Sequence, residues 1–385
     1  MTMIQIAMAG AGAAGMRYTQ HLLKTGQAQI AGIFDETQEA AAELAAHCGC
    51  SVFASLEALL EAVPEGVVFV CSRQPENKAR HVIQALQQGR HVIAELPAAS
   101  RLQDVRDMLA AAGPSAKRLL FTNPERFYFH NADVKKRIAG GAIGSIGMIN
   151  AKRYSPLPSE HADSISYGAA SDDSVSLSPA IQPGANQAAW TDSIRWSNGQ
   201  QEPEGQEAPA GALYRLALSD IGHLRWIAGD VASVYAMRTV AEGLDYVLVT
   251  LKFQCGAIAN IEAYWGYPGG YVSAAEYAGP KGVIRYDSRK TNALSIHKTG
   301  HAGAHAQAKH QSSPSFRDPE VAEFTHLLSC ITDSQQPVST AADVLETLKV
   351  TDAALQSIRS GQPVEMAAFA AADQLDDGKG DGERA

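Results

Sequence analysis

The segment GRHVIAELPAAS, residues 89–100, ends an apolar run with a carboxylate. Residues 92–94 predict a short buried strand, and Glu95, Leu96 and Pro97 follow it directly. A carboxylate at a strand end can orient a ligand or exchange a proton, whereas leucine does not titrate. The segment therefore raises the question whether this strand end carries proton chemistry or only supports a ligand.

A glycine motif near the N-terminus predicts a phosphate site. Gly10, Gly12 and Gly15 have the spacing G-x-G-x-x-G, directly after a predicted strand and at the opening of a predicted helix. In that setting the first glycine permits a tight turn, the second lets the backbone approach a pyrophosphate, and the third lets helix and strand pack closely. The helix N-terminus would then face the phosphates.

Asp35 follows Gly15 by 20 residues and ends the second predicted strand. A carboxylate at that place accepts hydrogen bonds from the adenosine ribose and repels a 2′-phosphate. We therefore expect NAD as the cofactor in preference to NADP. Arg17 and Lys24 are not placed to reverse this preference.

The elements that must position these residues alternate along the first third of the chain. Over residues 1–122 short apolar strands alternate with amphipathic helices, which predicts a dinucleotide-binding Rossmann domain with a doubly wound parallel sheet. Residues 123–370 hold a series of strands with few helices, which predicts a second, α+β domain with a large, mostly antiparallel open sheet. Residues 371–385 are expected to be a disordered tail.

Two polar segments are left over by this division. Residues 155–210 are rich in Ser, Pro, Gly, Asn and Gln, and are expected to be a long excursion over a site or a partly disordered segment. His297, His301, His305 and His310 include four-residue spacings that could suit a metal on a helix. Because glycines interrupt that helix and no carboxylate or cysteine joins the cluster, we expect a mobile loop and no metal site.

Composition narrows the classes of partner. Apolar residues make up 45% and charged residues 19%, which is ordinary for a globular protein with ample core material. The net charge of −9 and the lack of a basic block argue against nucleic acid or an anionic membrane as partner. The odd number of five cysteines fits a reducing cytoplasm better than a disulfide framework. The sequence has no apolar run long enough to span a membrane.

Several segments together resemble one protein family. They are GAGAAG, ALQQGRHVIAELP, NPERF, IAGGAIGSIGMI, DIGHLRWIAGD, LKFQCGAIANIE and PVSTAADVLETLKVTDAALQSIRSGQPVEM. In these segments, and in their order, the chain resembles the Gfo/Idh/MocA family of sugar and cyclitol oxidoreductases from end to end. The resemblance implies an NAD(H)-dependent dehydrogenase or reductase that acts on a sugar, cyclitol or related polyol or keto compound, as a homodimer or homotetramer.

The motif and the resemblance together predict the cofactor site. Its expected members are Gly10, Gly12, Ala13, Ala14, Gly15, Asp35, Cys71, Ser72, Glu95, Leu96, Pro97 and Asn123. Arg126, in NPERF, is expected to position the substrate, against the alternative of an ion pair between the domains.

The chain departs from the family at two positions that handle protons. The family has Glu-Lys-Pro where this chain has Glu95-Leu96-Pro97, and the family's lysine contacts the nicotinamide ribose and the substrate and assists proton transfer. Ser219 stands where the family's catalytic histidine often stands, and Asp220 matches the aspartate that follows. The strand end is therefore expected to support the cofactor, with Glu95 beside the nicotinamide ribose, without carrying the family's proton chemistry.

Two replacements for the missing groups are possible. Asp220 and His223 can share one helical face, so that the carboxylate fixes an imidazole tautomer and leaves the other nitrogen as a base. Alternatively, the phenol of Tyr154 could act. The competing interpretations are a packed or capping histidine and a tyrosine that packs on a sheet.

These departures keep two other functions open. One is an enzyme of the same fold that performs elimination or hydrolysis through transient oxidation. The other is a catalytically silent protein that binds NAD(H) and a sugar.

Overall fold

The structure is a computed structural model that describes residues 3–99, 101–113, 119–156, 211–241, 244–290, 294–298, 308–312 and 318–371. The described residues form two units. The first contains those up to Tyr128 and those from α9 (Pro319–Thr332) to Leu345. The second contains those from Phe129 to residue 312 and those from Glu346 onward.

A parallel sheet forms the centre of the first unit, with the strand order β3-β2-β1-β4-β5-β6. Its strands are β1 (Ile4–Ala9), β2 (Ala28–Phe34), β3 (Ser51–Val52), β4 (Val67–Val70), β5 (Val92–Ala94) and β6 (Leu119–Phe121), and every neighbouring pair is parallel. The chain winds from β1 outward to β3, then returns to β4 and continues to β6. This is the strand order of a Rossmann fold, so the predicted doubly wound sheet is confirmed.

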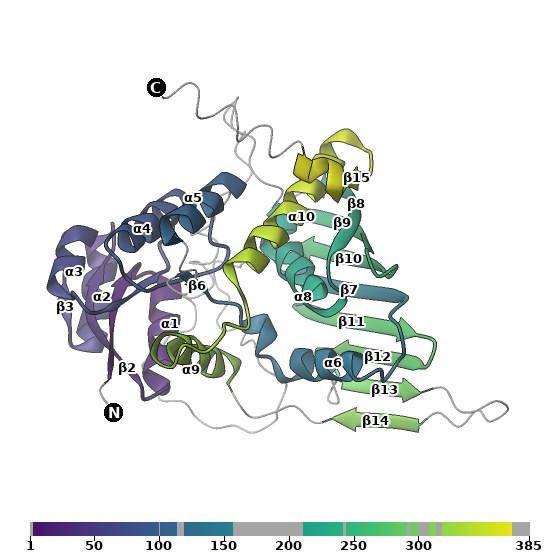
Figure 1. Cartoon of the computed structure of the whole chain (residues 1–385), viewed down its shortest axis with the longest axis horizontal. Helices are drawn as coiled ribbons and strands as arrows, with labels where there is room; N and C mark the ends of the chain where they lie inside the picture. Colours follow the sequence, from purple (N-terminus) through teal and green to yellow (C-terminus); the bar gives the residue numbers. More distant parts are fainter. Residues whose placement is uncertain are drawn as a thin grey trace. The chain divides into compact units, whose positions relative to one another are not determined.

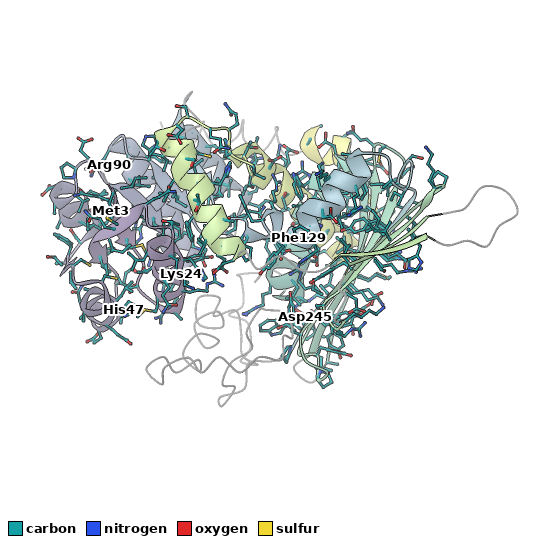
Figure 2. All side chains as sticks on the ribbon, turned by 90° about the horizontal axis from the view of Figure 1, so that it is seen from below. Met3, Lys24, His47, Arg90, Phe129 and Asp245 are labelled. Carbon is teal, nitrogen blue, oxygen red and sulfur yellow. The ribbon has the colours of Figure 1, made fainter. Side chains whose placement is uncertain are left out.

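Helices connect the strands of this sheet. They are α1 (Ala13–Lys24), α2 (Gln38–Cys48), α3 (Leu56–Ala62), α4 (Pro75–Gln87) and α5 (Leu102–Ala112). These helices confirm the alternation expected over residues 1–122, whereas β3, α3 and α9 were not predicted from the sequence. In α3 the C-terminal carbonyls of Leu60 and Val63 accept hydrogen bonds from Arg90, labelled in Figure 2. A cation at a helix C-terminus is favourable, and here it ties α3 to the turn that leads into β5.

Helix α9 completes the core on one face of this sheet, although it lies far along the chain. Its Phe324 is fully buried with Ile6 and Phe69 of the sheet and Tyr18 of α1. The ring centroid of Tyr18 lies 5.1 Å from that of Phe69 and 5.8 Å from that of Phe324. Arg17 and Lys24 of α1 face carboxylates at the start of α9, Glu320 and Asp318 respectively. The positive charges of Arg17 and Lys24 are therefore paired with carboxylates of the protein itself.

The second unit is built on a nine-stranded sheet with the order β14-β13-β12-β11-β7-β10-β9-β8-β15. Its strands are β7 (Met148–Ser155), β8 (Val231–Ala241), β9 (Leu244–Phe253), β10 (Ile258–Trp265), β11 (Val272–Gly279), β12 (Gly282–Asp287), β13 (Leu294–Lys298), β14 (Ala308–Ser312) and β15 (Val364–Glu365). Only β7 and β10 pair in parallel among the described strands, and the other neighbours are antiparallel. The predicted mostly antiparallel second sheet is confirmed.

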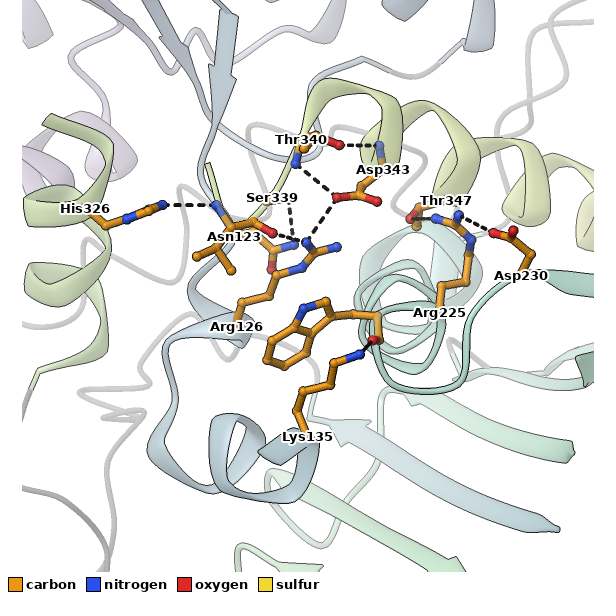
Figure 3. Close-up of polar contacts among 12 residues, drawn as sticks. Asn123, Arg126, Lys135, Arg225, Asp230, His326, Ser339, Thr340, Asp343 and Thr347 are labelled. Atoms are coloured by element: carbon orange, nitrogen blue, oxygen red, sulfur yellow. Dashed lines mark hydrogen bonds and ion pairs between the residues drawn. The ribbon is translucent and has the colours of Figure 1, made fainter. Parts of the chain in front are cut away.

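Three helices cover one face of this sheet (Figure 1). They are α6 (Phe129–Ala139), α8 (Leu218–Ala228) and α10 (Ala341–Ser360), of which the part from Glu346 belongs to this unit. Lys135 of α6 donates a hydrogen bond to the carbonyl of Trp226, near the end of α8. Arg225 of α8 donates to the Thr347 hydroxyl of α10 at 3.0 Å (Figure 3). The sequence analysis had not assigned α10.

A π-helical turn, Leu213–Ala217, leads into α8. The backbone N–H of Ala212 donates to the carboxylate of Asp245 at 2.8 Å, and Arg238 grips the same carboxylate with two nitrogens at 2.9 and 3.0 Å. The start of this helix is therefore fixed to strands β8 and β9. The position of α8 matters because it carries two of the expected site residues, Asp220 and His223.

The histidine-rich segment corrects one expectation. His297 lies in β13 and His310 in β14, and these two strands pair antiparallel, with Ile296 opposite His310. The expectation of a mobile loop is therefore wrong at both ends of the segment, because Leu294–Lys298 alternates apolar and polar residues as a strand requires. His301 and His305, residues 157–210 and the tail from residue 372 lie outside the described residues. In the described part of the chain no helix is long and apolar enough to cross a membrane.

Glu323 is a buried acid at the junction of α9 with the end of β6. Its side chain is fully buried, and one carboxylate oxygen accepts a hydrogen bond from the backbone N–H of Asn123. The other oxygen has no hydrogen-bond partner among the described residues. Burial raises the pKa of Glu323 to about 8, so the folded protein holds this side chain as the neutral acid at pH 7.

We predict that Glu323→Gln raises the melting temperature and that the gain grows between pH 5 and pH 8. In this window the unfolded chain ionises Glu323, with an ordinary pKa of 4.5, while the folded chain keeps the proton, so wild-type stability falls as the pH rises. The amide removes that dependence, and each kcal/mol corresponds to about 2–4 °C in a domain of about 150–250 residues. Thermal unfolding measured at four pH values checks this.

The matched control is Glu320→Gln on the same helix. Glu320 faces His21 at 2.7 Å and Arg17 at 3.7 Å, so its amide should lower the melting temperature at pH 7. A Glu323→Gln gain that is equal at pH 5 and pH 8 would contradict the buried neutral acid.

Candidate functional site

Two of the three motif glycines are required by close backbone contacts. Gly10 has a φ of +119°, and a Cβ atom there would lie 2.6 Å from the backbone carbonyl carbon of Cys71. A Cβ atom on Gly15 would lie 2.5 Å from the carbonyl oxygen of Gly10. Neither position has room for a side chain, so the loop and the start of α1 can pack this closely only with glycine.

Gly12 is in a different situation. It is the N-cap of α1, with a φ of −60° and no side chain to cap the helix. Among the described residues a Cβ atom here would approach only the Arg73 guanidinium, at 3.6 Å. The N–H groups of the first turn, which include those of Ala13 and Ala14, have no intrahelical acceptors. The space beside Gly12, the N–H groups of the first turn of α1 and the Arg73 guanidinium together suit a bound pyrophosphate.

Asp35 fastens the loop from the end of β2. Its carboxylate accepts hydrogen bonds from the backbone N–H of Ala11 at 2.7 Å and of Thr37 at 2.8 Å. The side chain is buried, with 6% of the residue exposed. A carboxylate has about four acceptor positions, so two backbone bonds leave capacity for ribose hydroxyls.

A buried histidine lies behind this strand end. His81 of α4 lies 2.8 Å from the Ser72 hydroxyl through Nδ1 and 3.4 Å from the Glu36 carboxylate through Nε2. Burial, and secondarily Arg80, lower the pKa of His81 to about 4, so the ring is neutral at pH 7. Glu36, next to Asp35, therefore faces a neutral imidazole, and the cation near its carboxylate is the Arg80 guanidinium at 4.0 Å.

Cys71 and Ser72 lie at the end of β4, as expected. Their side chains are buried and engage the backbone of β1 and the glycine loop: the Cys71 thiol donates to the Gly10 carbonyl at 3.3 Å, and the Ser72 hydroxyl lies 3.4 Å from the Ala9 carbonyl oxygen. These two side chains therefore hold the loop in place. Their expected contact with the cofactor remains a prediction.

Glu95, Leu96 and Pro97 form the turn at the end of β5. Glu95 is buried, and its carboxylate accepts a hydrogen bond at 3.0 Å from Lys78 of α4. The Leu96 N–H donates to the Thr122 hydroxyl at 3.2 Å, the Leu96 side chain is half-buried, and the Leu96–Pro97 peptide bond is cis. A cation therefore lies at this turn, but Lys78 of α4 supplies it, because position 96 is a leucine.

Asn123 and Arg126 lie at the end of β6, where their polar groups engage segments near α9 and α10 (Figure 3). The Asn123 amide donates to the Ser339 hydroxyl at 3.4 Å. Arg126 is buried and donates to the Val338 carbonyl and, at 3.2 Å, to Asp343. These contacts lie within the first unit and favour a structural role for Arg126 over the expected contact with a substrate.

The second unit holds its own buried polar cluster on the helix-covered face of the sheet. Arg153 of β7 donates two hydrogen bonds to the carboxylate of Asp220 of α8, from Nε at 3.0 Å and from Nη2 at 2.7 Å. It also donates to the Tyr271 hydroxyl at 3.0 Å. One turn along α8, His223 lies 3.1 Å from the Tyr277 hydroxyl through Nε2. Asp220, His223 and Arg153 are each less than a tenth exposed. The helix does bring Asp220 and His223 to one buried region, where the carboxylate is held by a guanidinium.

Tyr154 does not join this cluster. Successive side chains of a strand point to opposite faces, so Tyr154 lies on the face opposite Arg153 and α8. There its hydroxyl donates to Glu262 of β10, and its ring packs against Tyr264 and Tyr267. Burial and the hydrogen bond to Glu262 raise the pKa of the phenol. Both the position and the hydrogen bond correct the expectation that the Tyr154 phenol could act in place of Asp220 and His223.

Two polar residues of these clusters were missed from the sequence. Arg153 is in phase with the apolar residues Ile149 and Ala151, so period-two counting could have found a charge on the buried face. Lys78 lies in the first turn of α4, where a cation is unfavourable to the helix dipole, but nothing local identifies Glu95 as its partner. No group of three or more potential metal ligands lies together in the described part of the chain.

Comparison with known families identifies both units. The model described as the oxidoreductase family, NAD-binding Rossmann fold, matches residues 4–122, and the model of that family's C-terminal alpha/beta domain matches residues 182–366. The chain belongs to the Gfo/Idh/MocA oxidoreductase family. Its glycine loop, Asp35 and the β5 turn are therefore parts of a Gfo/Idh/MocA NAD-binding domain.

The relatives compared with the chain are distant in sequence. The D-glucoside 3-dehydrogenase of Escherichia coli (strain K12) is 27% identical over 151 residues, which cover 39% of this chain and 43% of that protein. An uncharacterized oxidoreductase of Bacillus subtilis (strain 168) is 22% identical over 314 residues, 78% of this chain and 77% of that protein. A levoglucosan dehydrogenase solved with NADH and L-sorbose has a TM-score of 0.74 and 17% identity, with 95% of this chain and 99% of that chain covered. The last comparison shows the shared fold.

The unequal surroundings of the motif glycines lead to a prediction. Gly12→Ala should leave the melting temperature near that of the wild type, because its Cβ meets only the Arg73 side chain among the described residues. The same methyl occupies the open side of the loop, so we expect NADH to bind at least about tenfold more weakly, which is about 1.4 kcal/mol. NADH fluorescence titration and thermal unfolding measure the two effects.

Gly10→Ala is the matched control. Its methyl would meet the Cys71 backbone at a strained φ, so stability should fall by about 1–3 kcal/mol or more. If Gly12→Ala bound NADH as tightly as the wild type, the pyrophosphate would not approach the loop at Gly12.

Proposed function

We propose that the protein is a dehydrogenase that uses NAD(H) in preference to NADP(H) and acts on a sugar, a cyclitol or a related polyol or keto compound. The observation that carries the cofactor preference is the carboxylate of Asp35, fixed by the Ala11 N–H at the glycine loop. The residues that would hold the cofactor are the loop at Gly10–Gly15, Asp35 and the Glu95–Pro97 turn. When bound, NAD(H) supplies the acceptor or donor of a hydride.

Charge at the end of β2 supports the preference for NAD. A 2′-phosphate at this strand end would meet the carboxylate of Asp35, and the neighbouring Glu36 adds a second negative charge that Arg80, 4.0 Å away, offsets in part. Like charges 4 Å apart repel by about 1 kcal/mol in water and by about 4 kcal/mol near a protein surface. Arg17 and Lys24 are engaged by Glu320 and Asp318 of α9, so they do not offset this repulsion.

The substrate class is supported by relatives and by side-chain chemistry. The compared proteins include one named a D-glucoside 3-dehydrogenase and one solved with L-sorbose. In this chain a set of hydrogen-bond donors and acceptors lies close together in the second unit. The set consists of Arg153, Asp220, Tyr271, His223 and Tyr277. Groups of this kind bind hydroxyls, which suits a substrate with several of them.

Proton transfer is the least typical part of the proposal. Oxidation of an alcohol releases a proton that a base near the carbinol oxygen must accept. Leu96 and Ser219 cannot accept it at neutral pH. We propose His223 as the base, since a neutral imidazole keeps one nitrogen as an acceptor, and Asp220 as the group that Arg153 holds in position beside it on the helix.

Our prediction for the cofactor concerns Asp35→Asn. The amide keeps an oxygen to accept a hydrogen bond from the loop but loses the negative charge. The wild type should bind NADH at least about fivefold more tightly than NADPH, which corresponds to about 1 kcal/mol of repulsion. Asp35→Asn should narrow that ratio, mainly through tighter NADPH binding. Fluorescence titration with both nucleotides measures the ratio, and equal wild-type affinities would overturn the assignment.

A prediction for the reaction concerns His223→Ala. With a panel of sugars and cyclitols as substrates and NADH formation as the readout, the substitution should lower kcat by about 100-fold or more, the usual value of general-base assistance. NADH affinity should stay within a few-fold of the wild type. Tyr154→Phe is the matched control and should leave kcat unchanged, because its hydroxyl lies on the opposite face of the sheet.

Three outcomes would decide against parts of the proposal. A fully active His223→Ala variant would show that His223 is structural. A product other than the oxidised or reduced substrate would favour elimination or hydrolysis. A wild type that binds NADH but turns over none of the panel would favour a silent binder, the function that Leu96 and Ser219 keep open.

A further inference from the structure

Lys78 is a buried cation that the cofactor-binding motifs do not account for. It lies in the first turn of α4, and only 6% of the residue is exposed. Both features are costly: burial removes water from the ammonium, and a positive charge near a helix N-terminus opposes the helix dipole. A lysine at this place therefore needs strong acceptors.

The acceptors all belong to the turn at the end of β5. The Lys78 ammonium lies 3.0 Å from the Glu95 carboxylate, 3.0 Å from the Pro97 carbonyl oxygen and 3.5 Å from the Glu95 carbonyl oxygen. An ammonium has three N–H donors, and three acceptors from one short turn face it here. The carboxylate of Glu95 is as deeply buried as the ammonium, with side chains 9% and 7% exposed.

The position of this contact matters for ligand binding. Helix α4 starts just after β4, and Glu95 ends β5, so Lys78 bridges the carboxyl ends of two adjacent parallel strands. Ligands of open α/β sheets bind at this edge. The direction of the Glu95 carboxylate and of the turn that follows therefore depends on a residue 17 positions earlier in the chain.

We propose that Lys78 is a positioning residue for the nicotinamide half of the cofactor. It acts through Glu95 and the Pro97 carbonyl, and supplies from α4 the positive charge that position 96 lacks. Because its three donors are taken by the turn, Lys78 orients the Glu95 carboxylate and does not itself pass a proton to a substrate. The inference rests on the proposed NAD(H) site.

The test compares two ligands that share the adenosine half. NADH reaches the β5 turn through its nicotinamide ribose, whereas ADP lacks that part and needs only the glycine loop and the end of β2. Lys78→Met should weaken NADH binding at least about tenfold, or about 1.4 kcal/mol, and leave ADP binding within twofold. A merely structural lysine would affect both ligands alike. Lys24→Met, at an exposed lysine of α1 in the same unit, should change neither.

A second variant covers the case in which Lys78→Met leaves Glu95 as an uncompensated buried charge and does not fold. Lys78→Met/Glu95→Gln removes both charges, so it should fold, bind ADP normally and bind NADH at least about tenfold more weakly. Wild-type NADH affinity in either variant would overturn the role of Lys78. A wild type that binds ADP but no NADH would overturn the proposed function itself, and this inference with it.

Discussion

A carboxylate that is buried away from water must find donors, and the parts of this molecule where chemistry is expected depend on four of the buried carboxylates, Asp35, Glu95, Asp220 and Glu323. Asp35 takes two backbone N–H groups, one of them from the glycine loop, and thereby joins the ends of β1 and β2. The Glu95 carboxylate accepts a hydrogen bond from Lys78, and the Asp220 carboxylate accepts hydrogen bonds from Arg153. In both pairs the donor lies on a different helix or strand from the carboxylate. Glu323 keeps a proton instead. Each solution fixes the end of a strand or the face of a helix where chemistry is expected.

The parts of the fold that the sequence predicts are those with a local cause. The strand–helix alternation over residues 1–122 follows from the period of the apolar residues. The roles of Gly10 and Gly15 follow from the G-x-G-x-x-G spacing between a strand and a helix. The NAD-binding domain could therefore be predicted before any coordinates. Elements shorter than the patterns that identify them, such as β3 and α3, could not.

The parts that the sequence could not predict depend on contacts between distant segments. The residues around Lys78 in the sequence do not indicate that it pairs with Glu95. In the same way, the NPERF segment does not indicate that Arg126 donates a hydrogen bond to Asp343, 217 positions later. The error over Tyr154 is of another kind. Arg153 and Tyr154 are neighbours in the chain, yet they lie on opposite faces of β7, and the phase of Ile149 and Ala151 already shows which face is buried. The face on which Tyr154 lies could therefore be predicted from the sequence.

The place of α9 in the first unit has a consequence for synthesis of the chain. Asn123 and Glu323 are 200 positions apart, and Phe324 packs against Tyr18 and Phe69. At translation rates of about 5–20 residues per second, the N-terminal part waits about 10–40 s on the ribosome before α9 emerges. Throughout that interval the core around Phe69 lacks the Phe324 ring. The core of the Rossmann unit is thus completed late in synthesis, because Phe324 joins Tyr18 and Phe69 only after α9 has been made.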